Sequence, residues 1–359
     1  MVITIISTVI VLGIIVFVHE LGHFLSMKRL GVGVNKFSLG FGPKLIGKKI
    51  GETEYQIAVF PLGGFVKPVG EDPREEVKEE DRARSLSTQP IWKRGVIFSA
   101  GSLFNLLLAA VLFSAVNLFG IPYFPPKIGE VSPGLPAEKA GLRKGDLVLS
   151  IDDVRVTKWD DLSKIIHGSK GKELLMKVKR DGEIFEITVT PQLSKVKNLF
   201  GEEVQTVMIG ITPTEEILVE KVNPFVAFGM GFAQTWSGIK LTVVSVVKLI
   251  QRVVPAKTIG GPILIAQLAG EQAKRGLVSF GLFIAILSIN IGIINFFPIP
   301  ILDGGHLFFL GLEAVLRKPL SIRKMEIAQQ VGLIFILLLM LFAFYNDLLR
   351  VFSPGGFKF

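Results

Sequence analysis

The feature that most restricts how this chain can fold is a set of four long apolar stretches. Each is close to the ~20 residues that an α-helix needs to cross a hydrocarbon core about 30 Å thick. The mean hydropathy of +0.53 and the hydrophobic content of 49% are also too high for a soluble domain with a polar surface. The sequence therefore predicts an α-helical integral membrane protein with four transmembrane helices. The stretches are residues 2–25, 95–119, 277–297 and 331–349.

Charge and cysteine content narrow the classes of function. The net charge of +9 could suggest a nucleic-acid partner, but much of the Lys and Arg lies between the apolar stretches, where it orients a membrane protein. We therefore expect membrane lipid, and no nucleic acid, among the partners. Cysteine is absent, which excludes thiol catalysis and cysteine-ligated zinc. A metal site in this chain must use His, Asp or Glu.

The loop between the first two apolar stretches is basic and is therefore expected in the cytoplasm. Within it, residues 54–59 and 65–69 are predicted as strands joined by a turn at residues 61–64. This hairpin is too apolar for water, so we expect it to re-enter the membrane, where protein or a water-filled cavity must satisfy its backbone. The mixed-charge run 71–84 is expected to be a solvated linker.

Residues 127–192 form the one clearly soluble-looking segment, with short alternating strands predicted around a tight turn at residues 181–182. The run 129–137, followed by Gly141 and Gly145 at positions that suit tight turns, resembles the bacterial PDZ domain. The resemblance implies one mostly β domain, inserted between the second and third spans on the extracytoplasmic side. The alternative is a generic small β domain. The sequence does not identify a PDZ ligand.

The run His19-Glu20-Leu21-Gly22-His23, at the end of the first apolar stretch, is an HExxH motif. Its i, i+4 spacing places both imidazoles on one face of a helix, where they can share a zinc ion. Glu20 then lies beside the metal, where a carboxylate can act as general base toward water. His and Glu are costly inside a membrane and normally mark function there. The alternative is that these side chains only reach from the interface toward water.

A catalytic zinc usually takes three protein ligands and keeps one position for water, so a third ligand is expected elsewhere in the chain. Asp303 is the best candidate, because it lies just beyond the third apolar stretch. His306 competes with it on spacing alone. The simpler alternative for Asp303 is a turn-forming Asp-Gly pair.

Together, HExGH in the first apolar stretch and NxxPxPxLDG in residues 295–304 resemble the signature of the site-2 proteases, which are intramembrane zinc metalloproteases. The resemblance implies His19, His23 and Asp303 as ligands of one zinc ion and Glu20 as catalytic base. It leaves His306 outside the set of ligands. The single PDZ-like domain resembles the bacterial envelope-stress branch of that family, many members of which carry two. That branch implies a protein of the bacterial inner membrane.

The same resemblance implies cleavage within or near transmembrane segments of other proteins, with anti-sigma factors or remnant signal peptides as substrates. Such a helix must be unwound first, and an edge strand of the predicted hairpin can pair with the unwound segment. Asparagine side chains can hold its freed backbone groups, although they can equally join neighbouring helices. Residues 101–105 match the family's GPxxN motif, except that Ser102 replaces proline. The candidate substrate-binding residues are Asn105, Asn295, Gly63, Gly64 and Phe65.

A shared zinc ion also restricts the topology. No Lys or Arg precedes the first stretch, so we expect the N-terminus outside and the HExxH motif near the cytoplasmic leaflet. If Pro224–Ile250 also crossed the membrane, Asp303 would lie on the opposite face, ~30 Å from the histidines. We therefore expect this region to lie on the outer surface or beside the core.

The predicted order of segments follows from these arguments. It is a first transmembrane helix (1–26), a cytoplasmic loop with the re-entrant hairpin (27–94), a second helix (95–120), an extracytoplasmic PDZ domain (121–192), an extracytoplasmic or membrane-surface connector (193–276), a third helix with the LDG motif (277–306), a cytoplasmic loop (307–330), a fourth helix (331–350) and a C-terminal tail (351–359).

Two other classes of function fit some of these features. A membrane scaffold would bind partners through the PDZ domain and keep a vestigial metal site, but the retention of both Glu20 and Asp303 argues against it. A metal-dependent channel or transporter would need polar faces on several spans, whereas residues 331–341 are almost wholly apolar.

Overall fold

The computed structural model describes residues 1–70, 78–318 and 320–353. Residues 71–77 of the predicted linker and residues 354–359 of the predicted tail lie outside this description. The chain divides into two compact units. The first consists of Met1–Val116, Ala227–Val247 and the chain from Pro255 onward. The second consists of Asn117–Val226 and Lys248–Val254.

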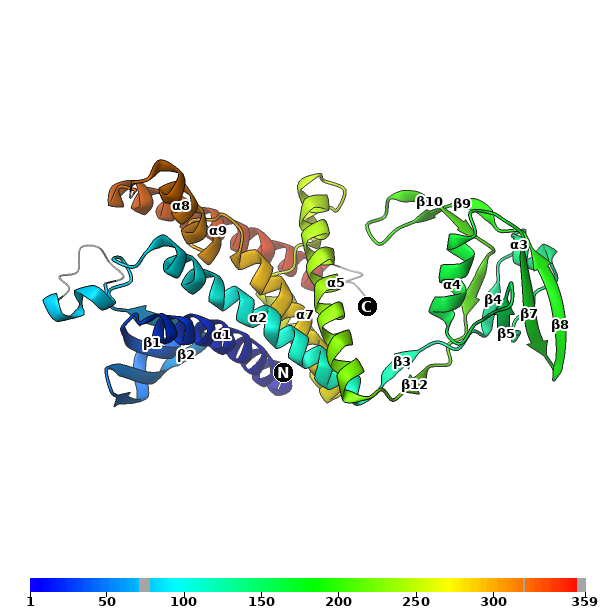
Figure 1. Cartoon of the computed structure of the whole chain (residues 1–359), viewed down its shortest axis with the longest axis horizontal. Helices are drawn as coiled ribbons and strands as arrows, with labels where there is room; N and C mark the ends of the chain where they lie inside the picture. Colours follow the sequence, from blue (N-terminus) through cyan, green and yellow to red (C-terminus); the bar gives the residue numbers. More distant parts are fainter. Residues whose placement is uncertain (71–77, 319, 354–359) are drawn as a thin grey trace. The chain divides into compact units, whose positions relative to one another are not determined.

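Four helices in the described part of the chain are long and apolar enough to cross a membrane, which confirms that prediction. Glycines allow α2 to pack between α1 and α7 (Figure 1). A Cβ atom on Gly22 of α1 would lie 2.9 Å from the carbonyl carbon of Ala100 in α2. On the other side of α2, a Cβ atom on Gly292 of α7 would lie 3.2 Å from the carbonyl oxygen of Ser102. The four helices are α1 (Val2–Leu30), α2 (Ile91–Leu118), α7 (Leu277–Asn295) and α9 (Ile322–Phe352).

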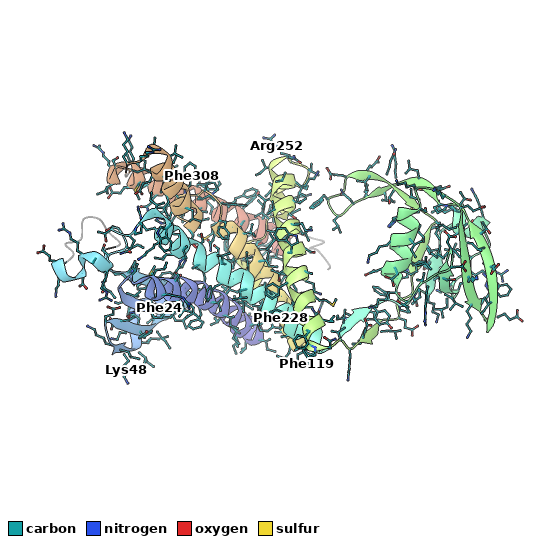
Figure 2. The ribbon with its side chains drawn as sticks, in the orientation of Figure 1. Phe24, Lys48, Phe119, Phe228, Arg252 and Phe308 are labelled. Atoms are coloured by element: carbon teal, nitrogen blue, oxygen red, sulfur yellow. The ribbon has the colours of Figure 1, made fainter. Side chains whose placement is uncertain are left out.

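A β-sheet made from β1 (Val34–Ile50) and β2 (Thr53–Pro68) packs beside α1. The sheet is held by aromatic contacts, including Phe24 of α1 against Phe37 of β1, with ring centroids 5.2 Å apart. Figure 2 shows Phe24 on α1 and Lys48 on the part of the sheet that extends away from this contact. Most of the outer part of β1, including Ile46, is exposed to solvent or lipid.

The predicted hairpin is present, because β2 reverses direction between Ile57 and Gly64, which both pair with Leu39 of β1. β2 is a continuous strand through this reversal, and a separate turn at Gly51, which has a φ of 62°, joins β1 to β2. Lys36 of β1 pairs with Glu54 on one side and with Lys67 on the other, so β2 curls around β1 and pairs with it twice. A Cβ atom on Gly64 would lie 2.9 Å from the carbonyl oxygen of Ser38, so this glycine permits close strand packing where the chain has reversed.

Three further α-helices belong to the first unit. α5 (Pro224–Ile250) is not among the four apolar helices above. It packs on α2 through small residues, since a Cβ atom on Gly231 would lie 2.7 Å from the carbonyl oxygen of Ala110. α6 (Pro262–Arg275) packs on the N-terminal half of α1. α8 (Asp303–Leu316) follows the turn that ends α7.

The N-terminus of α6 is fixed by α9. The buried carboxylate of Asp347 accepts hydrogen bonds from the backbone N–H groups of Gly261, Ile263 and Leu264 at 2.9–3.1 Å. Asp347 also pairs with Arg350 at 3.1 Å. The first unit also contains two short 3-10 helices, η1 (Glu79–Arg84) and η2 (Ala256–Thr258).

The second unit is mostly β. Its main sheet has the strand order β6-β5-β7-β8, and the predicted tight turn lies between β7 and β8, where Arg180 pairs with Glu183. The core includes Leu162 of α4 and Met176 of β7, both fully buried. The elements are β3 (Ile121–Tyr123), β4 (Ile128–Val131), α3 (Pro136–Lys139), β5 (Leu147–Ile151), β6 (Val154–Arg155), α4 (Trp159–Gly168), β7 (Leu174–Arg180), β8 (Glu183–Val189), β9 (Gln192–Lys197), β10 (Glu203–Met208), β11 (Ile211–Pro213) and β12 (Leu218–Glu220).

This unit continues beyond residue 192, where the sequence analysis ends the PDZ domain. β11 pairs with β4, and Ile211 lies opposite Val131. β12 pairs with β3, and Ile209 is buried in the core of the unit. Part of the segment that was expected to be a connector therefore completes the β unit.

Candidate metal centre

The HExxH motif lies on α1, as expected from its helical spacing. The Nε2 atoms of His19 and His23 lie 3.2 Å apart, one turn from each other on the same face. His23 is buried and His19 is partly buried. The two imidazoles therefore point their Nε2 atoms to one place.

Asp303, the first residue of α8, brings a carboxylate to the same place. Its Oδ2 atom lies 3.2 Å from Nε2 of His19 and 3.3 Å from Nε2 of His23. Two glycines allow α8 to start so close to the end of α7, because a Cβ atom on Gly305 would lie 2.5 Å from Cα of Pro300, and one on Gly304 would overlap the backbone of Phe296. His19, His23 and Asp303 form the group of potential metal ligands found in the described residues.

The chemistry of this group fits a zinc ion. Asp303 Oδ2 is buried and has no hydrogen-bond partner, although a buried carboxylate oxygen is costly to leave without one. Two imidazoles and one carboxylate are a common ligand set for catalytic zinc, with a fourth position left for water. The side chains of His19, His23 and Asp303 would hold the ion.

α2 forms a wall of the centre at a glycine. A Cβ atom on Gly101 would lie 2.8 Å from Nε2 of His19, so a larger residue cannot occupy this position without a shift. Two groups of α2 also face the imidazoles. The carbonyl oxygen of Ile97 lies 2.8 Å from Nδ1 of His23, and Nδ2 of Asn105 lies 3.3 Å from Nδ1 of His19. Gly101 is the glycine of the GPxxN-like motif, although no role at the metal was predicted for it, and Ile97 lies in no recognised motif.

Glu20 lies between the metal centre and β2. Its carboxylate accepts a hydrogen bond from the backbone N–H of Val66. A Cβ atom on Gly64 would lie 3.1 Å from Cγ of Glu20. The strand segment that includes the predicted substrate-binding residues Gly64 and Phe65 therefore runs beside the predicted catalytic base. The preceding glycine, Gly63, contacts the ring of Phe41, which in turn stacks on Phe65.

His306 and Asn295 are the two remaining residues that the sequence singles out. His306 is not a member of the ligand group found in the described residues, and its ring stacks on Phe98 of α2 with centroids 4.5 Å apart. Asn295 is the last residue of α7 and is partly buried. Its role in substrate binding stays a prediction.

Charged contacts hold the elements around the centre. Arg94 of α2 pairs with Glu313 of α8 at 2.6 Å, which ties the helix that carries Asp303 to the wall of the site. Glu52, in the turn of the β-sheet, accepts hydrogen bonds from Lys28 of α1 and from Arg84. These two cations hold the pKa of the Glu52 carboxyl below its ordinary value.

Comparison with known proteins agrees with this centre. The chain matches the family described as Peptidase family M50 over residues 7–339. A Mesorhizobium japonicum protein named "Putative zinc metalloprotease mll0638" is 37% identical over 364 residues, which cover 96% of this chain and 98% of the relative. The "Regulator of sigma-W protease RasP" of Bacillus subtilis is 29% identical over 431 residues, which cover 97% of this chain and 99% of the relative.

Among solved structures, the PDZ domain of the SdrC-like protein from Listeria monocytogenes aligns with 25% of this chain and 88% of its own length. The sequence identity is 23% and the TM-score is 0.21. A score this low does not establish a shared fold, so the PDZ identity of the β unit stays a prediction.

The family match covers both the HExxH motif and Asp303, whose side chains converge although 280 residues separate His23 from Asp303. The chain is a multi-pass membrane protein, because it has four helices that are long and apolar enough to cross a membrane: α1, α2, α7 and α9. The chain therefore belongs to peptidase family M50, the site-2 proteases, and is a zinc metalloprotease of the membrane.

Proposed function

We propose that this protease cleaves transmembrane segments of other membrane proteins, at a zinc ion held by His19, His23 and Asp303. The observation that carries the proposal is the position of these ligands on α1 and at the start of α8, within a bundle of membrane-crossing helices. Zinc bound there supplies a Lewis acid that polarises the scissile carbonyl group and acidifies a water molecule. A substrate for this centre must therefore reach it through the bundle.

Glu20 is the proposed general base. Its carboxylate is one residue from His19 and is oriented by the N–H of Val66. It can take a proton from the attacking water and pass that proton to the amine that leaves when the peptide bond breaks. Because Val66 belongs to β2, the sheet and the base are positioned by the same contact.

We assign substrate binding to the segment of β2 that contains Gly63, Gly64 and Phe65. It pairs with β1 through Gly64 and Leu39, and no further strand among the described residues pairs with its other edge. An unwound substrate segment can add to that edge as a strand, with its backbone groups paired and its scissile bond near Glu20. Asn295, at the end of α7, is assigned to a freed backbone group of the same segment.

The remaining assignments concern topology and substrate. The basic loops favour a centre near the cytoplasmic leaflet of the inner membrane and a β unit outside. There the β unit, as a PDZ domain, filters substrates rather than taking part in the chemistry. The name of the Bacillus subtilis relative, a regulator of sigma-W, supports anti-sigma factors as one substrate class, with remnant signal peptides as the other.

The test uses purified full-length protein in detergent and a model transmembrane substrate. Glu20→Gln should retain zinc and reduce cleavage by roughly 10²–10⁴-fold, as expected for loss of a general base. Asp303→Asn should lose both zinc and cleavage. Glu271→Gln, the same chemical change on the exposed surface of α6, is the matched control. Normal cleavage by Glu20→Gln would refute the assignment, and a wild-type protein that binds membrane proteins without cleaving them would favour a scaffold.

A further inference from the structure

The two imidazoles of the metal centre each direct Nδ1 at α2. For His23, the partner is the backbone carbonyl oxygen of Ile97 at 2.8 Å. A carbonyl oxygen can only accept a hydrogen bond, so Nδ1 of His23 must carry the hydrogen and donate it. This contact leaves Nε2 of His23 with the lone pair that a metal ion requires.

The partner of His19 presents the opposite chemistry. Nδ2 of Asn105 lies 3.3 Å from Nδ1 of His19. An amide NH₂ group can only donate, so in this orientation Nδ1 would have to accept and the hydrogen of the neutral ring would sit on Nε2. However, Nε2 of His19 lies 3.2 Å from both Nε2 of His23 and Oδ2 of Asp303, at the point where the ligand atoms converge. A nitrogen that carries a hydrogen cannot also bind the metal.

The other end of the same side chain shows a second mismatch. Asn105 is fully buried, and its Oδ1 atom has no hydrogen-bond partner. A buried acceptor without a partner costs roughly 1–3 kcal/mol. A half-turn of the planar carboxamide exchanges Oδ1 and Nδ2, which have similar size. After that turn, Oδ1 faces Nδ1 of His19 and can accept its hydrogen.

We propose that Asn105 is a positioning residue for the metal ligand His19, and that in the zinc-loaded protein its Oδ1 accepts a hydrogen bond from Nδ1 of His19. The inference rests on the proposed zinc centre. It gives α2 one role toward both histidines, because the Ile97 carbonyl and the Asn105 carboxamide each fix the imidazole that presents Nε2 to the metal. The amide nitrogen then takes the former position of Oδ1, so the exchange resolves the mismatch at His19.

The test compares zinc retention against a competing chelator in purified full-length variants. Asn105→Asp keeps an acceptor toward His19 and removes the donor, so it should hold zinc about as well as the wild type. Asn105→Leu removes the acceptor and should weaken zinc binding by roughly 10–100-fold, as loss of such a partner typically does. The control is Asn117→Leu, the same change at a buried position of α2, about 18 Å further along the helix, which should keep zinc.

Loss of zinc from folded Asn105→Asp would overturn the inference, because it would show that the donor group is what His19 requires. Normal zinc retention by Asn105→Leu would overturn it as well. Only protein that is monodisperse and helical by circular dichroism is scored, and if the Leu variant does not fold, the Asp variant alone decides. A wild-type protein without zinc would instead refute the proposed centre itself.

Discussion

Gly101 of α2 lies against His19 of α1 so closely that a Cβ atom at position 101 would be 2.8 Å from Nε2 of the imidazole. Gly101→Ala should therefore displace a proposed zinc ligand, and we expect zinc affinity and cleavage to fall together by at least about tenfold. Gly95→Ala is the matched control on the same helix, because nothing lies within 4 Å of a Cβ atom there. Zinc content by elemental analysis beside a gel assay of cleavage measures both. Full zinc occupancy in Gly101→Ala would contradict this account of the wall.

The parts of the metal centre that could be predicted are those whose residues lie close together in the sequence. His19, Glu20 and His23 lie within five residues, so helical spacing alone puts the imidazoles on one face. Asp303 was the best candidate for the third ligand, and the family resemblance removed the competing His306. The structure places the carboxylate among the ligand atoms and the ring of His306 on Phe98. The motif at residues 101–105 pointed to α2, but the contact of Gly101 with the imidazoles and the carbonyl group of Ile97 could not be predicted, because both depend on how α2 packs against α1.

The fold shows the same division between local and distant signals. The four apolar helices were predicted from composition and length. The chain reversal predicted at residues 61–64 occurs between Ile57 and Gly64, but within a continuous strand, because Gly63 and Gly64 allow close packing against β1. The pairing of β11 with β4 joins segments about 80 residues apart, so local patterns could not extend the β unit beyond residue 192.

The ion pair between Arg94 and Glu313 offers a second test, because it ties α2 to the helix that begins with Asp303. Both side chains are 18% exposed, so removal of one partner leaves a largely buried charge. Glu313→Ala should lower the melting temperature and weaken zinc retention several-fold, by roughly 1 kcal/mol. The double variant Arg94→Glu with Glu313→Arg should recover part of both. A double variant no better than Glu313→Ala would show that the pair does not position α8.

Acid should weaken the attachment of the β-sheet at Glu52. Since Lys28 and Arg84 lower the pKa of this carboxyl in the folded protein, its contribution to stability is present above the unfolded pKa and is lost as the pH falls through the folded pKa. Glu52→Gln should lower the melting temperature at pH 7 by roughly 1–3 °C, and the difference should disappear well below pH 4. Thermal unfolding in detergent at several pH values measures it, with Glu183→Gln as the control. A difference that is independent of pH would argue against the ion pairs.

The proposed topology can be tested with single cysteines, because the native chain has none. Cysteine at Lys48 in β1 or at Lys318 after α8 should resist an impermeant thiol reagent in intact cells and react after permeabilisation. Cysteine at Glu183 in β8 should react in intact cells once the reagent can pass the layers of the cell envelope that lie outside the inner membrane. Positions 48 and 318 test the loops on both sides of the proposed centre. Labelling of position 318 in intact cells would refute the placement of the centre near the cytoplasmic leaflet.

The last prediction concerns which substrates are accepted, and it starts from the position of Gly64 between Ser38 and Glu20. If the substrate adds to this edge of β2 as a strand, its helix must first unwind, and the cost of unwinding then enters the rate. Each Gly lowers helix stability by about 1 kcal/mol relative to Ala, and 1.4 kcal/mol corresponds to about tenfold in an equilibrium. A substrate span with glycines near its cytoplasmic end should therefore be cut faster than an all-Leu span.

Gly64→Ala separates this mechanism from general damage to the site. The added methyl group would lie 2.9 Å from the carbonyl oxygen of Ser38 and 3.1 Å from Cγ of Glu20, so it should disturb the edge strand and slow cleavage of both spans. The fold reduction in cleavage rate should be larger for the all-Leu span. Its unwound state is less populated, so its cleavage depends more on pairing with the free edge of β2. Gly13→Ala, in open space on α1, is the control. The measurement is the initial cleavage rate of both spans by the wild type, Gly64→Ala and Gly13→Ala. Equal wild-type rates for the two spans would show that unwinding does not limit cleavage. Normal cleavage rates in Gly64→Ala would show that β2 is not part of the substrate site.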